Sequence, residues 1–373
     1  MYQRGYIFLS HSHFEGGVKV GSHHLSEKVA AIQGSGPVFH ISTPVSVLQS
    51  TLRREKSSDR YKMSRAGARK REEVTDIVPS QVTPPRWRVS TRANRKFTTS
   101  IHTLDVDQWV VLVDQPLFHK LANDVRASMN VPTKIIYRPT DIHPSGPLAR
   151  AEKRMVAIAD AIIATSQYTL ETVREQSRAD RNLPSYVIEN GVDIELFSGS
   201  NLAETMRSGF IYVGAIDSRF DWESVILLAA AFPQESFTLV GPVSAEVPQL
   251  PPNVSCVGTV PYAGVPALMA QAKVGLLPFN SNSLNAGRSP MKFYEYLAAG
   301  LVVTGSRTSE LDSRHAPNTW LWDNAANVVA KVSQAYSQDA SSAGIEHARQ
   351  FDWKLRAAEL VRIIDSLFDS NSG

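Results

Sequence analysis

Residues Gln108–Val113 read Gln-Trp-Val-Val-Leu-Val, and Asp114 follows them directly. A short apolar run that ends at a polar residue is typical of a strand buried on both faces, as in parallel sheets. Similar runs, separated by amphipathic helical stretches, lie at residues 6–10, 38–41, 134–137 and 160–165. The first half of the chain is therefore predicted to be an α/β domain with a parallel, doubly wound sheet.

The same alternation restarts after residues 198–208, a polar stretch rich in Ser, Gly and Asn that is typical of a linker. The second half predicts strands at residues 210–214, 237–240, 254–257, 274–278 and 301–304, the last of these being the final strand. It predicts helices at residues 221–232, 265–272, 291–298, 325–336 and 352–368. Two doubly wound halves bind a ligand at the carboxyl ends of their strands, and a cleft between them is expected.

Composition excludes several classes of protein. The chain has 373 residues, of which 43% are hydrophobic and 20% charged, as in a soluble protein with two cores. No apolar run approaches the roughly 20 residues of a membrane-spanning helix. The apolar stretch at residues 6–9 is too short for a signal peptide, so export is not expected. Cys256 is the single cysteine, which excludes an intrachain disulfide and a cysteine-based zinc or iron–sulfur site.

Basic residues gather in one segment. Residues 53–96 hold 14 Lys and Arg against 5 Asp and Glu, whereas the rest of the chain holds 25 against 31. Aromatic side chains such as Tyr61 and Trp87 lie among the cations. Such a segment favours an anionic membrane surface first, a solvated loop second and nucleic acid last, so nucleic acid is not an expected partner.

Two motifs resemble those of a known family. Residues 190–197, Asn-Gly-Val-Asp-Ile-Glu-Leu-Phe, resemble the interdomain turn of the GT-B glycosyltransferases. Residues 289–300, Ser-Pro-Met-Lys-Phe-Tyr-Glu-Tyr-Leu-Ala-Ala-Gly, resemble their nucleotide-sugar helix. More narrowly, the chain is similar to the membrane-associated glucuronosyltransferases of xanthan assembly at residues 6–25, 134–141, 210–241 and 275–296.

This resemblance implies a GT-B fold, in which two Rossmann-like domains face each other across a cleft. It implies an acceptor-binding domain over residues 1–188, a nucleotide-sugar-binding domain over 189–350, and a C-terminal helix over 351–373 that crosses back to the first domain. It further implies transfer of a sugar, glucuronate with inversion, from a UDP-sugar to a lipid-linked or glycan acceptor. The enzyme is then expected in the cytoplasm, peripheral at the inner face of the plasma membrane.

Asp141 is the candidate general base. It follows the strand at residues 134–137 together with Arg138, at the strand's carboxyl end, where ligand-binding residues lie. A sugar hydroxyl has a pKa far above 7, so an inverting transferase needs a carboxylate within hydrogen-bond reach to take its proton. The xanthan-type enzymes place their base at the matching position. The structural alternative is that Asp141 caps a turn, and His143 ranks second as a base.

Lys292 and Glu295 are the main donor-binding candidates. Lys292 lies in the first turn of the helix at residues 291–298, where free N–H groups and the helix dipole suit a diphosphate. Its charge would stabilise the leaving group. Glu295 lies one turn later and could accept hydrogen bonds from both ribose hydroxyls. The xanthan-type enzymes have an amide there, so Glu295 departs toward retaining GT-B enzymes. The structural alternative is a solvated helix face.

Further candidates complete the proposed site. Phe279 matches an aromatic position that can stack on uracil, although core packing is nearly as well supported. The other donor-side candidates are Gly214, Ile216, Arg288, Ser289 and Met291. The acceptor or phosphate side comprises Gly17, Lys19, His23 and Arg138. A carboxylated donor also needs a cation, for which Arg288, Lys19 and Arg219 are available.

No metal cofactor is expected. His11, His13, His23 and His24 crowd one loop, but their spacing fits no tetrahedral zinc template. Asp105 and Asp107 form an Asp-x-Asp pair, and a surface turn is its more plausible interpretation. Three alternatives to an inverting transferase stay open: a retaining GT-B hexosyltransferase, a UDP-sugar epimerase, and a non-catalytic protein that binds nucleotide-sugars or nucleic acid.

Overall fold

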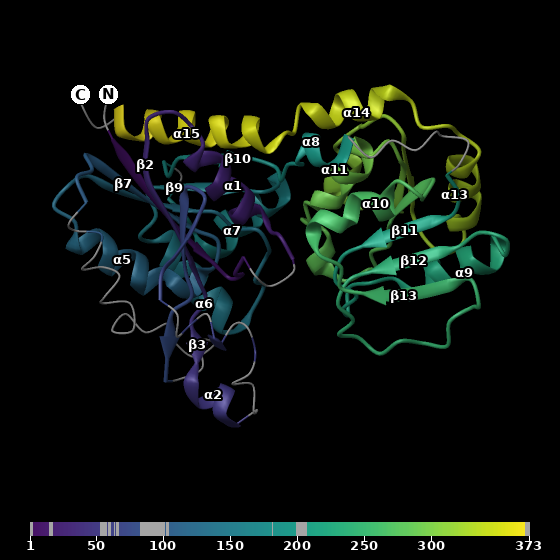
Figure 1. The fold of residues 1–373 in the computed structure, drawn as a ribbon, viewed down its shortest axis with the longest axis horizontal. Helices are drawn as coiled ribbons and strands as arrows, with labels where there is room; N and C mark the ends of the chain where they lie inside the picture. Colours follow the sequence, from purple (N-terminus) through teal and green to yellow (C-terminus); the bar gives the residue numbers. More distant parts are fainter. Residues whose placement is uncertain are drawn as a thin grey trace. The chain divides into compact units, whose positions relative to one another are not determined.

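The computed structural model describes residues 3–14, 18–52, 58, 61–62, 64, 67–82, 101, 104–180, 182–198 and 207–369. The chain divides into two units (Figure 1). Unit 1 comprises Met1–Glu189 and Arg356–Gly373, and unit 2 comprises Asn190–Leu355. The last helix, α15 (Trp353–Asp369), begins in unit 2 and continues into unit 1. There Arg4 forms an ion pair with Asp365 at 2.6 Å, so the C-terminal helix does cross back to the first domain.

Unit 1 contains an eight-stranded sheet in the order β10-β9-β8-β7-β1-β2-β5-β4. All neighbouring strands are parallel except β4 and β5. The strands are β1 (Arg4–Ser10), β2 (Ser35–Ser42), β4 (Arg69–Arg71), β5 (Val74–Ile77), β7 (Gln108–Val113), β8 (Thr133–Tyr137), β9 (Ala161–Ala164) and β10 (Ser185–Val187). The strand order reverses between β1 and β7.

Helices of unit 1 pack along this sheet. They are α1 (Gly21–Ala30), the 3₁₀ turn η2 (Pro116–Phe118), α5 (His119–Ser128), α6 (Gly146–Val156) and α7 (Gln167–Ser177). Helix α1 contacts β1, β2 and β5, whereas α5 contacts β7 and β8, and α7 contacts β9 and β10. Each helix therefore connects successive parallel strands, as a doubly wound sheet requires.

A small knob projects from unit 1. It is built from β3 (Val45–Ser46), α2 (Val47–Leu52) and β6 (Ser80–Gln81), and Figure 1 shows α2 and β3 away from the main sheet. Val45 and Val78 form its core with Tyr61. Three apolar side chains of the knob are exposed: Leu48 by 46%, Leu52 by 76% and Val82 by 72%. The knob overlaps the basic segment at residues 53–96, much of which, including Trp87, lies outside the described residues.

Unit 2 contains a six-stranded parallel sheet in the order β13-β12-β11-β14-β15-β16, which reverses between β11 and β14. Its strands are β11 (Phe210–Val213), β12 (Phe237–Val240), β13 (Val254–Gly258), β14 (Val274–Leu277), β15 (Val302–Ser306) and β16 (Thr319–Trp322). Its helices are α8 (Ile194–Ser198), α9 (Trp222–Ala231), α10 (Val265–Met269), α11 (Met291–Ala298), α12 (Ser309–Asp312), α13 (Val328–Tyr336) and α14 (Ser342–Arg349), with the 3₁₀ turns η4 (Tyr262–Gly264) and η5 (Ser283–Asn285).

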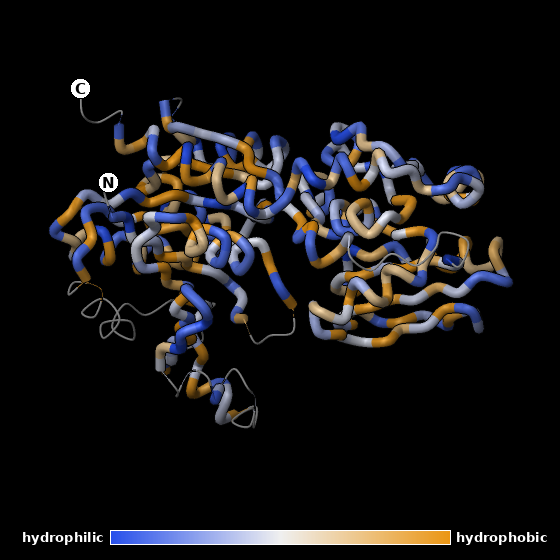
Figure 2. Tube along the Cα trace, turned by 45° about the horizontal axis from the view of Figure 1, so that its top comes forward, coloured by the Kyte–Doolittle hydropathy of each residue, from blue (hydrophilic) through white to orange (hydrophobic). Residues whose placement is uncertain are grey.

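The central strands are buried on both faces. Along β11, Ile211 and Val213 belong to one hydrophobic cluster, whereas Phe210 and Tyr212 belong to another. Successive side chains of a strand point to opposite faces, so each face of this sheet has its own core. Hydrophobic colouring accordingly follows the strands in Figure 2. The prediction of two doubly wound α/β domains is confirmed.

Several elements differ from the prediction. The strand near residues 301–304 is not the last, because β16 pairs with its far side. Strand β16 has four residues and one neighbour, which leaves little periodic signal in the sequence. The sequence pattern predicts a helix over residues 26–31, whereas α1 begins at Gly21, since His23 and His24 are polar by type but fully buried. The sequence patterns also gave no indication of α7, α14 or the knob.

The close packing of β14 against α11 depends on the absence of a side chain at Gly275. A Cβ atom there would lie 2.4 Å from the ring of Tyr296. That ring is fixed because the Tyr296 hydroxyl oxygen accepts a hydrogen bond from Val213 at 2.8 Å. We expect Gly275→Ala to lower the free energy of unfolding by about 2–3 kcal/mol through overpacking, measured by urea denaturation. Gly264→Ala is the control, since Gly264 has helical angles and its Cβ would meet only the side chain of Val260, at 3.2 Å. Equal stabilities of the two variants would contradict the packing account.

Candidate functional site

Two glycines lie in close contact at the carboxyl ends of β11 and β12, next to the point where the unit 2 strand order reverses. Gly214 follows β11 and donates a hydrogen bond to the Val240 carbonyl at 2.9 Å. Gly241 follows β12 with a φ of +142°, and a Cβ atom there would lie 1.9 Å from the Gly214 carbonyl oxygen. Ile216 is buried next to them and donates to the Pro242 carbonyl at 2.9 Å. A side chain at Gly241 would therefore clash with the backbone of Gly214. The backbone at this edge, where doubly wound sheets bind ligands, carries no side chain at these two positions.

The loops that follow β11 and β14 are tied together at the same edge. Asn280 and Asn285 both donate hydrogen bonds to the Arg219 carbonyl at 3.0 Å. Phe220 and Phe279 form an isolated antiparallel bridge. These bonds hold the two loops on either side of the point where the strand order reverses.

Charged groups lie on these joined loops. Arg219 donates to Asp217, with Nη2 2.6 Å from Oδ2. Burial opposes ionisation of Asp217, but the hydrogen bonds and charge of Arg219, together with the charge of Arg288, lower its pKa. Arg288 lies over the ring of Phe279 at 4.8 Å. Phe279 itself is 5% exposed and belongs to the hydrophobic core, so its ring has little free face for a base.

The start of α11 is held by two residues distant in sequence. The side chain of Asn190 donates to the Ser289 carbonyl at 2.8 Å. Arg314 donates to the Ser289 hydroxyl at 2.8 Å and lies over the rings of Phe293 and Tyr294. Pro290 then caps the helix and Met291 begins it, half-buried. The N–H groups of the first turn are thus placed by contacts on both sides.

Lys292, Glu295 and Tyr262 form a closed cluster at this helix start. Lys292 is ion-paired with the Oε2 atom of Glu295. The Tyr262 hydroxyl donates to Oε1 of Glu295 at 3.3 Å, and Lys292 lies 5.3 Å from the centre of the Tyr262 ring. The Glu295 side chain has no exposed surface, and that of Lys292 is 16% exposed. The interpretation of this pair as a solvated helix face is therefore wrong.

In unit 1, buried charges follow β7 and β8. Arg138 directly follows β8, and its Nη1 lies 3.5 Å from Oδ2 of Asp114, which directly follows β7. Both side chains are almost fully buried. Beside them, the Tyr137 hydroxyl donates to Glu152 at 2.5 Å. Burial raises the pKa of Glu152 to about 7, although the Tyr137 hydrogen bond lowers it in part.

Asp141 lies beyond this buried pair and is exposed. Its Oδ2 accepts a hydrogen bond from the Thr140 hydroxyl at 3.4 Å. Burial lowers the pKa of His143, and the Asp141 carboxylate opposes that shift. Asp141 and Arg138 therefore share the carboxyl edge of the unit 1 sheet, Arg138 as a buried group and Asp141 as an accessible one.

The predicted acceptor-side residues are largely internal. Lys19 pairs with Glu27 at 2.6 Å. His23 is fully buried and accepts the Val20 N–H on Nδ1 at 3.3 Å, which caps the start of α1. Burial, with the neighbouring His40, lowers the pKa of His23 to about 2, so its ring is neutral. Gly17 lies outside the described residues.

The residues considered for metal binding are dispersed. Asp107 precedes β7 and accepts the Gln3 N–H at 2.7 Å, at the opposite edge of the sheet from Asp114. His24 is buried, whereas His11 is exposed. Within the described part of the chain, no three His, Cys, Asp or Glu side chains gather closely enough to hold a metal ion.

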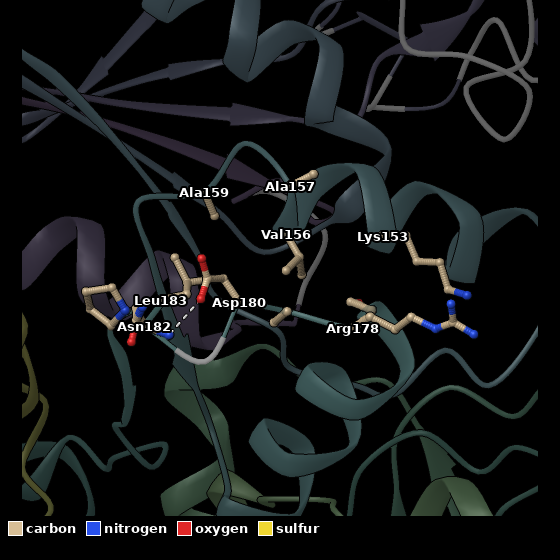
Figure 3. A pocket seen from close by; sticks show the side chains of 11 residues that line it. Lys153, Val156, Ala157, Ala159, Arg178, Asp180, Asn182 and Leu183 are labelled. Atoms are coloured by element: carbon tan, nitrogen blue, oxygen red, sulfur yellow. Dashed lines mark hydrogen bonds between the residues drawn. The ribbon is translucent and has the colours of Figure 1, made fainter.

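A separate pocket of about 410 Å³ lies in unit 1, between the ends of α6 and α7 and the loop before β10 (Figure 3). Ala159 and Pro184, which line it, precede β9 and β10. The pocket is thus at the amino edge of the strands and includes none of the predicted site residues. Lys153 and Arg178 are two of the residues that line it.

The sequence analysis missed three polar residues of these clusters: Tyr262, Asp114 and Glu152. Asp114 had a usable signal, since it directly follows a buried strand. Tyr262 and Glu152 had none, because neither lies at a strand end and each meets its partner only through tertiary packing. Glu152 even reads as a surface position, between Arg150 and Lys153 on α6.

Comparison with known proteins finds similarity to glycosyltransferases over part of the chain. A family model described as glycosyl transferase-like matches residues 223–362, which lie largely in unit 2. The putative teichuronic acid biosynthesis glycosyltransferase TuaH of Bacillus subtilis is 26% identical over 232 residues, covering 57% of this chain. The match spans 58% of that relative's own length.

Several solved structures have a similar fold over nearly the whole of this chain. A sucrose-phosphate synthase from Thermosynechococcus elongatus gives a TM-score of 0.73 at 16% identity, covering 99% of this chain and 100% of the other. Anabaena Alr3699/HepE, solved in complex with UDP and glucose, gives 0.66 at 16% identity, covering 97% and 99%. The fold of this protein, two Rossmann-like units with parallel sheets, is therefore the GT-B fold of glycosyltransferases.

Glu152 makes stability depend on pH. Its pKa is about 7 in the folded chain against an ordinary 4.5, so its stabilising contribution is complete below about pH 4.5 and is lost as the pH rises to about 7. Glu152→Gln keeps an acceptor for Tyr137 and does not ionise. We expect its free energy of unfolding, relative to wild type, to rise by about 3 kcal/mol between pH 5 and pH 8. The exposed Glu175→Gln is the control, and a pH-independent difference for Glu152→Gln would contradict the assignment.

Proposed function

We propose that this protein is a glycosyltransferase that moves a sugar from a UDP-sugar to an acceptor hydroxyl. The observation that carries the proposal is the Lys292–Glu295 pair at the start of α11, with Arg288 on the loop before this helix, at the carboxyl edge of a sheet whose strand order reverses there. This cluster lies within the segment that matches the glycosyl transferase-like family model. Anabaena Alr3699/HepE, which has a similar fold, is solved in complex with UDP and with UDP-glucose, which supports a nucleotide-sugar donor.

In this proposal unit 2 binds the donor. The α11 N-terminus and Lys292 hold the diphosphate, because free N–H groups and a lysine stabilise the charge that develops on a departing UDP. Glu295 accepts the ribose hydroxyls. Gly214, Ile216, Ser289 and Met291 shape the backbone around the nucleotide. Phe279 then acts through Arg288, which it supports, rather than by stacking on uracil.

Asp141 of unit 1 is the proposed general base. The acceptor oxygen attacks the anomeric carbon, the bond from that carbon to the UDP oxygen breaks, and the acceptor's proton passes to the Asp141 carboxylate. Exposure of Asp141 supports this role, since an accessible carboxylate can meet an incoming hydroxyl. Arg138, paired with Asp114, positions the loop that carries Asp141. Gly17, Lys19 and His23 stay predictions for the acceptor or phosphate side, with His23 acting as a helix cap.

Glucuronate is the proposed donor sugar and inversion the proposed stereochemistry, both on the resemblance to xanthan-type enzymes. Arg288 is the proposed cation for the sugar carboxylate, because it lies on the loop that leads into the α11 N-terminus, where the diphosphate is proposed to bind. A retaining transferase is the second candidate, favoured by the carboxylate of Glu295. The configuration at the product's anomeric carbon, read by NMR, separates the two.

No metal cofactor enters this proposal, because Lys292 and the N–H groups at the start of α11 supply the positive charge for the diphosphate. The proposed acceptor is lipid-linked or a glycan, and the proposed location is the inner face of the plasma membrane. The knob supports this, since Leu48, Leu52 and Val82 are exposed beside the basic segment at residues 53–96. Among the described residues, every helix is too short or too polar to cross a lipid bilayer.

Removal of the Asp141 carboxylate should abolish most transfer. With radiolabelled UDP-sugars and a membrane extract as acceptor, in buffer containing EDTA, Asp141→Asn is expected to lower kcat by about 100-fold or more. UDP affinity should not change, since unit 2 binds the donor. The exposed Asp124→Asn on α5 is the control. A variant that keeps most of its rate would exclude Asp141 as the base, and loss of wild-type transfer in EDTA would contradict the metal-free mechanism.

The knob should contribute to membrane binding. Leu48→Ser with Leu52→Ser removes apolar surface that inserts beside anionic headgroups, so we expect about tenfold weaker binding to phosphatidylglycerol vesicles by cosedimentation. Leu227→Ser is the matched control, because Leu227 is an exposed leucine of unit 2, 38% accessible. Equal binding by the two variants would contradict a role for the knob.

A further inference from the structure

Glu295 and Lys292 satisfy each other before any donor arrives. The Glu295 side chain has no exposed surface, and Lys292, which lies three residues earlier on the same helix face, pairs with it and is 16% exposed. Oε1 of Glu295 accepts from Tyr262, and Oε2 is ion-paired with Lys292. Lys292 and Glu295, which the proposed function assigns to donor binding, are thus paired with each other in the absence of a donor.

Withdrawal of Lys292 from this cluster would leave a buried carboxylate with one hydrogen bond from a neutral hydroxyl. A buried charge that loses its partner is strongly disfavoured unless new hydrogen bonds replace it. A ligand that draws Lys292 away must therefore also supply donors to Glu295. At neutral pH inorganic diphosphate presents mostly acceptor oxygens, and its donor is a retained P–OH group rather than a pair of neighbouring hydroxyls. A nucleoside diphosphate brings the same phosphates together with two ribose hydroxyls, which are donors.

We propose that Glu295 is a specificity-determining residue: it withholds Lys292 from free diphosphate and releases it only when ribose hydroxyls take its place. The inference rests on the proposed function and adds a selection step to it. Specificity of this kind comes from a penalty imposed on the wrong ligand rather than from extra contacts to the right one. The site then discriminates against the inorganic phosphates that accompany nucleotides in solution.

Tyr262 is a positioning residue in this cluster. Its hydroxyl donates to the carboxylate oxygen that Lys292 does not occupy, and its ring lies beside the Lys292 ammonium. The hydrogen bond lowers the charge density of the carboxylate and so weakens its hold on Lys292. Loss of the hydroxyl should tighten the Lys292–Glu295 pair, which is opposite in direction to neutralising Glu295.

The test measures binding of two probes, UDP and inorganic diphosphate, to the full chain by isothermal titration calorimetry. Glu295→Gln should bind diphosphate about tenfold more tightly than wild type, a change of about 1.4 kcal/mol, because Lys292 is no longer held by a carboxylate. It should bind UDP about tenfold less tightly, because the ribose loses its anionic acceptor. Glu346→Gln is the matched control, since Glu346 also pairs with a cation three residues away, Arg349, but on the exposed surface of α14.

Tyr262→Phe provides the second arm and should bind diphosphate less tightly than wild type. A purely structural role for the cluster would weaken diphosphate binding in both variants, so opposite directions support the proposal. Unchanged or weaker diphosphate binding by Glu295→Gln overturns it. If wild type binds no UDP, the proposed function fails on its own, whereas diphosphate binding by wild type and Glu295→Gln still decides whether Glu295 competes for Lys292. If Glu295→Gln does not fold, tighter or unchanged diphosphate binding by Tyr262→Phe overturns the proposal.

Discussion

Burial of parallel strands on both faces is the constraint on which both units depend. Along β7 and β11 every side chain from Trp109 to Val113 and from Phe210 to Val213 is buried, which leaves no place for a polar group within the strand. Polar residues are therefore confined to the strand ends. At the carboxyl ends they meet the loops and helix starts that can hold a ligand. The candidate residues of each unit gather at this edge for that reason.

Three buried carboxylates show how the partner decides what a buried acid does. Glu295 and Asp114 are paired with cations, Lys292 and Arg138, and the pairs keep charge in the interior. Glu152 has only the Tyr137 hydroxyl, and burial raises its pKa to about 7. Two of these carboxylates thus face a cation, and the third faces a neutral hydroxyl. The contacts around each carboxylate, rather than its residue type, set its environment.

Elements defined by consecutive residues could be predicted from the sequence, whereas contacts between residues distant in sequence could not. Strand β7 and helix α11 were predicted with their observed bounds, because burial and helical periodicity are written in consecutive residues. The short edge strand β16 was missed, since its pairing with β15 is a long-range event. Lys292 and Glu295 were predicted as separate ligands on one face. The ion pair between them depends on Tyr262, which packs against α11 from a different part of the chain.

The sequence by itself determined the class of fold, the two-unit organisation, the strand ends that Asp141 and Gly214 follow, and the helix start at which Lys292 lies. Periodicity and turn residues are local properties, so they can be recognised from the order of the residues alone. Only the tertiary structure decided which polar groups meet. It buried His23 as a helix cap, set Phe279 in the core beneath Arg288, and closed Lys292 on Glu295. Such contacts join residues brought together by folding, and their energies depend on burial that no local pattern records.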